Sequence, residues 1–332
     1  MPWLKRLHIN QFVLVLILVV STASIFPCTG GWKIFLSYLT SAAIALLFFM
    51  RGAKLSHPTV SASMKHWRLH LVVFISTFAL FPLIGLGMNL LVPGLITPTV
   101  YLGFLYLCAL PATMQSSIAF ISAAGGNVTA AICSAAASSI LGVFLSPLLV
   151  RTLMPGQGGD GDVLQVINAV MLELIVPFLA GYCVRLLIVK WVDRNHKLIN
   201  ITDTSSIILL VYTAFSAAIE DNLWHNIGVG SLLSIFITSL LLLAVLVIIN
   251  TYAARWLGFN TADEITIVLC GSQKSLANGI PMASMLFPAA TAGIIVLPLM
   301  IFHQVQLIVC ALLVQHYVDK IKKQRVTLDV KK

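Results

Sequence analysis

Residues 228–254 read GVGSLLSIFITSLLLLAVLVIINTYAA, a run of 27 residues without an Asp, Glu, Lys or Arg. An α-helix rises about 1.5 Å per residue, so about 20 apolar residues cross the hydrocarbon core of a bilayer. The composition of the whole chain agrees, because 59% of its 332 residues are hydrophobic and only 9% are charged. Soluble globular proteins carry about 25% charged residues. The sequence therefore excludes a soluble globular protein and predicts a membrane protein.

Further apolar runs, separated by charges or by Pro and Gly, predict an all-α polytopic membrane protein with ten transmembrane helices. The predicted spans are 10–27, 34–50, 69–92, 99–123, 128–150, 163–184, 203–219, 228–254, 264–286 and 291–317. The first run follows Lys5 and Arg6, as in a secretory signal. Its length and the lack of a clean cleavage site favour an uncleaved helix.

The net charge of +9 is explained by membrane topology. If both termini lie in the cytoplasm, 17 of the 20 basic residues fall in cytoplasmic segments, and only Lys33 and Arg151 fall outside. Cytoplasmic loops of membrane proteins are enriched in Lys and Arg. The sequence predicts a multi-pass protein of the cytoplasmic (inner or plasma) membrane with both termini inside. The lipid bilayer, rather than nucleic acid, is the partner that accounts for this charge.

Two short segments resemble each other at an offset of 158 residues. Gln115–Ala119 reads QSSIA and Gln273–Ala277 reads QKSLA, and each lies in the fourth span of a set of five. An odd number of helices per copy turns the second copy upside down, which is typical of secondary transporters. The sequence thus predicts two inverted five-helix repeats, residues 8–155 and 160–320, followed by a basic cytoplasmic tail, residues 321–332.

Both matched segments lie next to residues that break helices. Pro111 precedes the first, whereas Gly271 precedes and Asn278–Pro281 follow the second. In a membrane, backbone groups released by a break must face protein or water. We expect helices four and nine to be broken and to cross near the midplane, where polar side chains either bind substrate or ion or join neighbouring helices. The candidate binding residues are Thr113, Gln115, Ser116, Ser117, Ser272, Gln273, Lys274, Ser275 and Asn278.

Around these segments the chain resembles the bile acid:sodium symporter family, in particular its symporter-like (SBF-like) branch. The resemblance covers nearly the whole chain and rests on 77–82 (TFALFP), 123–127 (AAGGN), 146–149 (SPLL) and above all 270–275 (CGSQKS). It implies a core domain of spans 3–5 and 8–10 and a panel domain of spans 1, 2, 6 and 7. It also implies a sodium site where the broken fourth and ninth helices cross.

Several positions depart from the sodium-coupled members of that family. Their glutamate in the ninth helix aligns with Leu269. Two hydroxyl ligands in their fifth helix align with Ala131 and Ala135, although Ser117 and Gln273 match. Since sodium prefers oxygen ligands, these losses argue against sodium coupling, and sodium and the proton both stay open as the coupling ion.

Lys274, Glu173 and His303 are ionisable residues near the middle of predicted spans. A charge at the bilayer centre costs about 2.5–3.5 kcal/mol, which makes such residues functional candidates. We expect the Lys274 ammonium to take the place of sodium and to donate to Gln115, Ser117 and carbonyls of the fifth helix. The alternative is an ion pair with Glu173. His303 either packs between helices or joins Lys274 and Glu173 in proton coupling.

The sequence carries no HExxH, Walker or GxSxG motif, and its six cysteines are scattered. It therefore predicts no enzyme, no cofactor and no metal site. The expected function is secondary active transport of a small organic solute, favouring an organic anion, by alternating access. The alternative is a regulatory or sensor membrane protein that keeps the transporter fold without translocation. Nothing in the sequence indicates an obligate protein partner.

Overall fold

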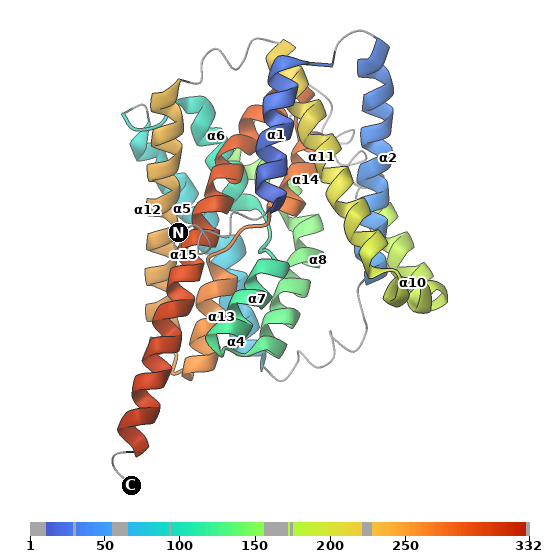
Figure 1. The fold of residues 1–332 in the computed structure, drawn as a ribbon. Helices are drawn as coiled ribbons and strands as arrows, with labels where there is room; N and C mark the ends of the chain where they lie inside the picture. Colours follow the sequence, from blue (N-terminus) through green and yellow to red (C-terminus); the bar gives the residue numbers. More distant parts are fainter. Residues whose placement is uncertain are drawn as a thin grey trace, which may run out of the picture. The chain divides into compact units, whose positions relative to one another are not determined.

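The computed structural model describes residues 11–28, 31–54, 66–92, 94–155, 172, 175–220 and 228–329. The regular elements within these residues are helices (Figure 1). Six segments are long and apolar enough to cross a membrane, namely Gly31–Met50, Trp67–Leu91, Val128–Leu153, Lys197–Ala217, Gly230–Trp256 and Thr291–Lys320. The protein is therefore all-α and polytopic, as predicted. The number of ten spans stays a prediction.

The chain divides into two compact units, which are described separately below. Unit 1 comprises Met1–Lys54, Gly158–Ile227 and Ile280–Ile294, and unit 2 comprises Leu55–Gln157, Gly228–Gly279 and Ile295–Lys332. Each unit is thus assembled from stretches that lie far apart in the sequence. The predicted inverted repeats, residues 8–155 and 160–320, and the tail, residues 321–332, stay predictions.

Unit 1 is held together by a close crossing of two helices. Its described helices are α1 (Gln11–Ile25), α2 (Gly31–Lys54), α10 (Val176–Arg194) and α11 (His196–Glu220). A Cβ atom on Gly52 of α2 would collide with the backbone of Phe178, and one on Gly181 of α10 would collide with the backbone of Phe49. Small residues let transmembrane helices approach this closely. The Arg185 guanidinium adds a hydrogen bond to the Ala53 carbonyl at 2.5 Å.

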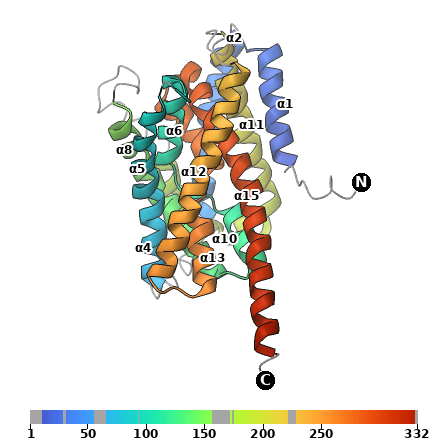
Figure 2. The ribbon, with the colours of Figure 1, turned by 90° about the vertical axis from the view of Figure 1, so that its left-hand side faces the viewer.

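Unit 2 contains most of the polar residues singled out in the sequence. Its first transmembrane segment is continuous and comprises α4 (Trp67–Ile75), a π-helical turn (Ser76–Leu80), α5 (Phe81–Gly87) and a 3₁₀ turn (Met88–Leu91). The others are α6 (Pro98–Ala109), α7 (Gln115–Ala124), α8 (Val128–Leu153), α12 (Val229–Trp256) and α13 (Thr261–Gly271). Two more helices, α14 (Leu276–Leu286) and α15 (Ala289–Asp329), have residues in both units. Figure 2 shows α13 beside α12 and α4.

Both matched segments lie at gaps between helices. α6 ends at Ala109 and α7 begins at Gln115, while α13 ends at Gly271 and α14 begins at Leu276. The two gaps touch, because the Ser275 N–H donates to the Pro111 carbonyl at 3.0 Å. Polar backbone freed by one gap is thus satisfied in part by the other, as burial in a membrane requires.

The expectation that Asn278–Pro281 breaks the ninth helix is wrong. These residues belong to α14, and Pro281 lies inside that helix. The Ser275 side chain immediately precedes α14, and its Oγ accepts a hydrogen bond from the Asn278 N–H at 3.2 Å. A serine in this position starts a helix, and Pro281 removes only one backbone donor. The break therefore falls earlier, at residues 272–275.

One end of unit 2 is fixed by a pair of asparagine caps. Asn127 Oδ1 accepts the Ala130 N–H (3.1 Å) at the start of α8, and Asn260 Oδ1 accepts the Asp263 N–H (2.9 Å) at the start of α13. The buried Asp263 carboxylate accepts from both asparagine amides, at 2.9 Å and 3.0 Å. One carboxylate therefore ties together two helix starts that lie more than a hundred residues apart.

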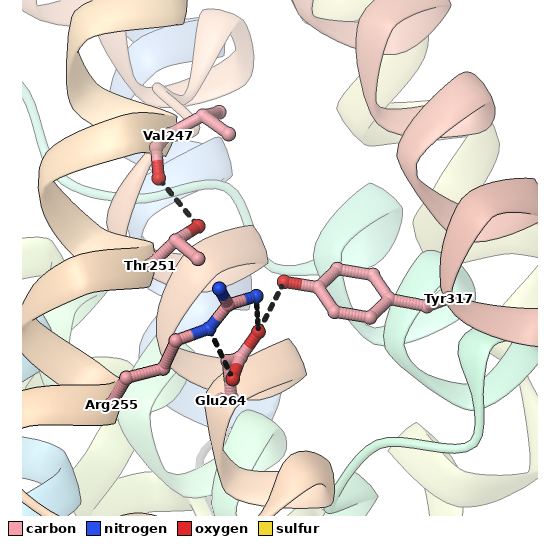
Figure 3. A network of polar contacts seen from close by, with 5 residues as sticks. All are labelled: Val247, Thr251, Arg255, Glu264 and Tyr317. Carbon is pink, nitrogen blue, oxygen red and sulfur yellow. Dashed lines mark hydrogen bonds and ion pairs between the residues drawn. The ribbon is translucent and has the colours of Figure 1, made fainter. Parts of the chain in front are cut away.

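A second carboxylate joins α12, α13 and α15 (Figure 3). Buried Glu264 accepts two hydrogen bonds from the Arg255 guanidinium, at 3.1 Å and 3.0 Å, and one from the Tyr317 hydroxyl at 3.2 Å. The close-up also shows Thr251 donating to the Val247 carbonyl one turn earlier on α12. Because bidentate Arg–carboxylate pairs fix orientation, this contact sets how α13 lies against α12.

Candidate functional site

Lys274 is fully buried in unit 2, between α13 and α14. Its Nζ donates to three backbone carbonyls, those of Thr77 (2.8 Å), Cys108 (2.9 Å) and Leu110 (2.5 Å). An ammonium has three N–H donors, and all of them are used here. The ring of Phe81 lies 4.0 Å from Nζ, measured to its centroid, which adds a cation–π contact. The burial of this charge is therefore offset by a complete set of partners.

A proline explains why the Thr77 carbonyl is free to bind Lys274. In the π-helical turn, the Phe81 N–H donates to the Ser76 carbonyl, so the next bond of that type would need an N–H from residue 82. Residue 82 is a proline, which has no N–H, and the Thr77 carbonyl is left for Lys274.

The end of α6 frees the other two carbonyls. The helix stops before Pro111, and the N–H of Ala112, which would have bonded the Cys108 carbonyl in a continued helix, donates to Ser138 Oγ at 3.0 Å. The last carbonyls of a helix have no partner within it and carry partial negative charge. The Lys274 ammonium neutralises this helix end.

The backbone of Lys274 is held by a side chain of α15. Gln306 Oε1 accepts the Lys274 N–H at 2.9 Å, and Gln306 Nε2 donates to the Lys274 carbonyl at 3.0 Å. The same Nε2 lies 2.7 Å from Nδ1 of His303. Lys274 is thus fixed at both its charged end and its backbone.

Gln273 points to the α7 side of the gap. Its Oε1 accepts from Ser116 Oγ (3.0 Å) and Ser117 Oγ (3.2 Å), and its Nε2 donates to Cys310 Sγ at 3.2 Å. The Ser116 hydroxyl also lies 3.2 Å from Thr113 Oγ1. The polar side chains of the two gaps therefore form one hydrogen-bonded cluster.

Two neutral side chains bind the end of α13. Ser76 Oγ donates to the Gly271 carbonyl at 2.8 Å, and Asn250 Nδ2 donates to Ser272 Oγ at 3.1 Å. The Asn278 side chain is largely buried near the start of α14.

The structure places the predicted site residues as follows. Thr113, Ser116, Ser117, Gln273, Ser275 and Asn278 lie at the touching gaps, and Ser272 lies at the end of α13. Gln115 is the first residue of α7, and its side chain lies outside the described part of the chain. Their role in binding stays a prediction.

The partners expected for Lys274 differ from those found. Its donors reach carbonyls of the π-helical turn and of the α6 end, rather than Ser117 or the carbonyls of α8. Glu173 lies outside the described residues, so its ion pair with Lys274 stays a prediction. Sequence reasoning missed the roles of Phe81 and Gln306, although a proline five residues after Thr77 was a readable signal for a freed carbonyl.

Helices apolar enough to cross a membrane, together with a polar centre at two helix gaps in unit 2, are typical of membrane transporters. The sequence model of the SBF-like CPA transporter family matches residues 10–319, and the chain belongs to that family. It is a multi-pass membrane protein, and the resemblance seen in the sequence is confirmed.

Relatives agree with this assignment. The chain is 56% identical to the "Putative symporter YfeH" of Escherichia coli (strain K12) over 309 residues, which cover 93% of each chain. It is 51% identical to an uncharacterized protein of Pseudomonas aeruginosa, over 93% of this chain and 92% of the relative. It is 27% identical to the "Sodium/bile acid cotransporter 7" of Rattus norvegicus, over 95% of this chain and 94% of the relative.

Proposed function

We propose that this protein is a secondary active transporter of a small organic anion, which works by alternating access without bound sodium. The observation that carries the proposal is the buried Lys274 ammonium, fixed by three backbone carbonyls where two helix gaps meet. A cation is supplied by the chain itself at the place where the family resemblance leads one to expect a sodium ion. Sodium is then not needed to balance the α6 end.

The class of solute follows from the sign of the local charge. α7 begins at the gap without a side-chain cap, and the start of a helix carries partial positive charge. Lys274 adds a full positive charge in surroundings of low dielectric constant, where its field reaches further than in water. The name of the rat relative, which specifies bile acid, supports an amphipathic organic anion.

Alternating access requires two bodies within one chain. The two compact units supply them, and they support the core and panel grouping implied by the resemblance. Unit 2 contains predicted spans 3, 4, 5 and 8 and most of spans 9 and 10, whereas unit 1 contains spans 1, 2, 6 and 7. We further propose that both termini lie in the cytoplasm, on the basis of the distribution of Lys and Arg.

A second candidate function is a regulatory or sensor membrane protein. It is favoured by the same contact, because an ammonium whose three donors are all satisfied within the protein leaves no exchangeable ion to drive transport. Such a protein would bind an organic anion without moving it.

Counterflow in proteoliposomes separates the two functions. A labelled bile acid and a panel of smaller organic anions are first screened by thermal shift with and without sodium, since a ligand stabilises the folded state it binds. We expect stabilisation and exchange of at least one anion, unchanged when sodium is replaced by potassium. Binding without exchange would favour the regulatory protein. Exchange that requires sodium would overturn the role given to Lys274.

A further inference from the structure

Both polar atoms of the Gln306 side-chain amide, on α15, form hydrogen bonds within unit 2. Its Oε1 accepts the backbone N–H of Lys274, and its Nε2 donates both to the Lys274 carbonyl and toward Nδ1 of His303. Gln306 is fully buried, so no water competes for these bonds. The amide therefore connects the segment between α13 and α14 to a histidine one turn earlier on α15.

These contacts determine where the proton of His303 lies. A backbone N–H only donates and a backbone carbonyl only accepts, so turning the Gln306 amide over would break both of its bonds to Lys274. The second Nε2–H of Gln306 must therefore point at His303, and His303 Nδ1 must accept it. An imidazole nitrogen accepts only when it carries no proton. His303 is thus neutral in this state, with its proton on Nε2.

We propose that His303 is the proton-binding residue of this transporter, and that its protonation and the Gln306–Lys274 bridge exclude one another. A protonated imidazole carries N–H groups on both nitrogens, so Nδ1–H would face an N–H of Gln306. The contact is relieved when His303 turns away or when Gln306 releases the Lys274 backbone. By linkage, a conformation that opens the bridge favours protonation to the same extent as protonation favours opening.

The neighbours of His303 indicate what accompanies the proton. Among the described residues, the titratable side chains on the elements that contact α15 are Lys274 in the gap, Tyr101, Tyr106 and Cys108 on α6, and Asp263, Glu264 and Cys270 on α13, with Cys310 on α15 itself nearest along the helix. The two carboxylates are engaged elsewhere, Asp263 by Asn127 and Asn260 and Glu264 by Arg255 and Tyr317. Among the described residues, which do not include Glu173, a proton on His303 therefore adds a second positive charge close to Lys274 with no carboxylate bonded to either group. An anionic solute beside the gaps would supply the missing negative charge. The inference rests on the proposed function and makes it proton–anion symport.

Hydrogen exchange of the full-length protein tests the switch without any transport measurement. Backbone exchange of residues 272–279 is followed by mass spectrometry, after correction for intrinsic rates, between about pH 8 and about pH 4, a range that extends below the one in which histidine usually titrates. We expect several-fold faster exchange of this segment in acid for the wild type and no such increase for His303→Phe. The matched control is His316→Phe, an exposed histidine on the same helix. An acid-dependent increase that persists in His303→Phe would refute the proposal.

Transport provides the second arm of the test. With an anion that shows counterflow, an inward proton gradient should drive accumulation in the wild type and in His316→Phe but not in His303→Phe. Gradient-driven accumulation by His303→Phe would refute the coupling role. If no anion exchanges at all, the proposed function fails, and the hydrogen-exchange result alone decides the switch.

A third experiment tests the tautomer of His303 and does not need the His303→Phe variant to fold. Nitrogen-15 NMR of the histidine-labelled wild type at neutral pH should contain a neutral ring with its proton on Nε2, which shifts or broadens when Gln306→Leu removes the donor. Spectra in which all histidine rings are either charged or protonated on Nδ1 would overturn the assignment.

Discussion

Replacement of Lys274 by Met tests whether the buried cation holds the site together. Met fills a similar volume without a donor, so the carbonyls of Thr77, Cys108 and Leu110 lose their shared partner. A buried polar group without a partner costs about 1–3 kcal/mol, or about 6 kcal/mol for three at the middle of the range. Removal of a charge from the bilayer centre returns about 3 kcal/mol. We expect a net destabilisation of about 3 kcal/mol.

The loss is measured as thermal unfolding in detergent, followed by size-exclusion chromatography. For a unit the size of unit 2, each kcal/mol of destabilisation lowers the unfolding temperature by about 2–4 °C, so the unfolding midpoint should fall by about 6–12 °C. Counterflow should also be lost. Lys274→Arg should retain part of the stability, because its guanidinium still donates to carbonyls, but it has to fit into a space shaped for an ammonium.

Arg151→Met is the matched control, because it removes one positive charge from the exposed end of α8. It should leave the unfolding midpoint and counterflow unchanged. The reasoning fails if Lys274→Met unfolds at the wild-type temperature and exchanges solute at the wild-type rate. In that case the three carbonyls would have found other donors, and the charge would have no function in the site.

Five further substitutions test the packing within each of the two units by the same unfolding assay. Glu264→Gln should lower the free energy of unfolding by about 1–3 kcal/mol. This is less than the loss of a fully buried ion pair would cost, because the Arg255 partner is half exposed. Tyr317→Phe should lower it by about 0.5–1.5 kcal/mol, and a larger loss for Tyr317→Phe than for Glu264→Gln would contradict the central role of the carboxylate. Asp263→Ala removes the acceptor shared by two helix caps and should lower the free energy of unfolding by about 2–4 kcal/mol. Hydrogen exchange should become faster at the starts of both α8 and α13. Faster exchange at only one of these helices would contradict the shared role. Gly181→Ala should lower the free energy of unfolding by about 1–3 kcal/mol, because it forces α10 away from α2. Gly230→Ala is the control and should be neutral, because its Cβ meets open space. Equal effects of the two substitutions would refute the close crossing.

The membrane class and the polar centre could be predicted from the sequence because both depend on local composition. A run such as residues 228–254 has one stable environment, and the structure places a helix there. Pro111 and the matched QSSIA and QKSLA segments indicated where polar residues would gather, and the gaps of α6–α7 and α13–α14 lie beside them. The helix breaker Pro281 was misleading, since a serine cap six residues earlier starts α14 ahead of it.

The partners of Lys274 could not be predicted because they are backbone groups. Whether a carbonyl is free depends on where the N–H of another residue is directed, and that depends on contacts far away in the sequence. The Cys108 carbonyl is free only because the Ala112 N–H donates to Ser138, 26 residues further along the chain. The sequence records only the part of this that depends on proline, such as Pro82 for the Thr77 carbonyl. The sequence therefore showed that Lys274 needed partners, and the fold was required to show which ones.

The backbone around the site requires a cation irrespective of what is transported. Pro82 withholds one N–H donor, Ser138 diverts another, and α6 ends before Pro111, so three carbonyl oxygens converge on one point. Convergent carbonyl oxygens attract positive charge, which either a dissociable ion or a tethered ammonium can supply. A tethered ammonium does not leave with the solute and so cannot carry energy across the membrane. If the chain transports actively, as we propose, the energy must come from another ion. His303, hydrogen-bonded through Gln306 to the backbone of the same lysine, lies where binding of a proton would depend on the state of the gap.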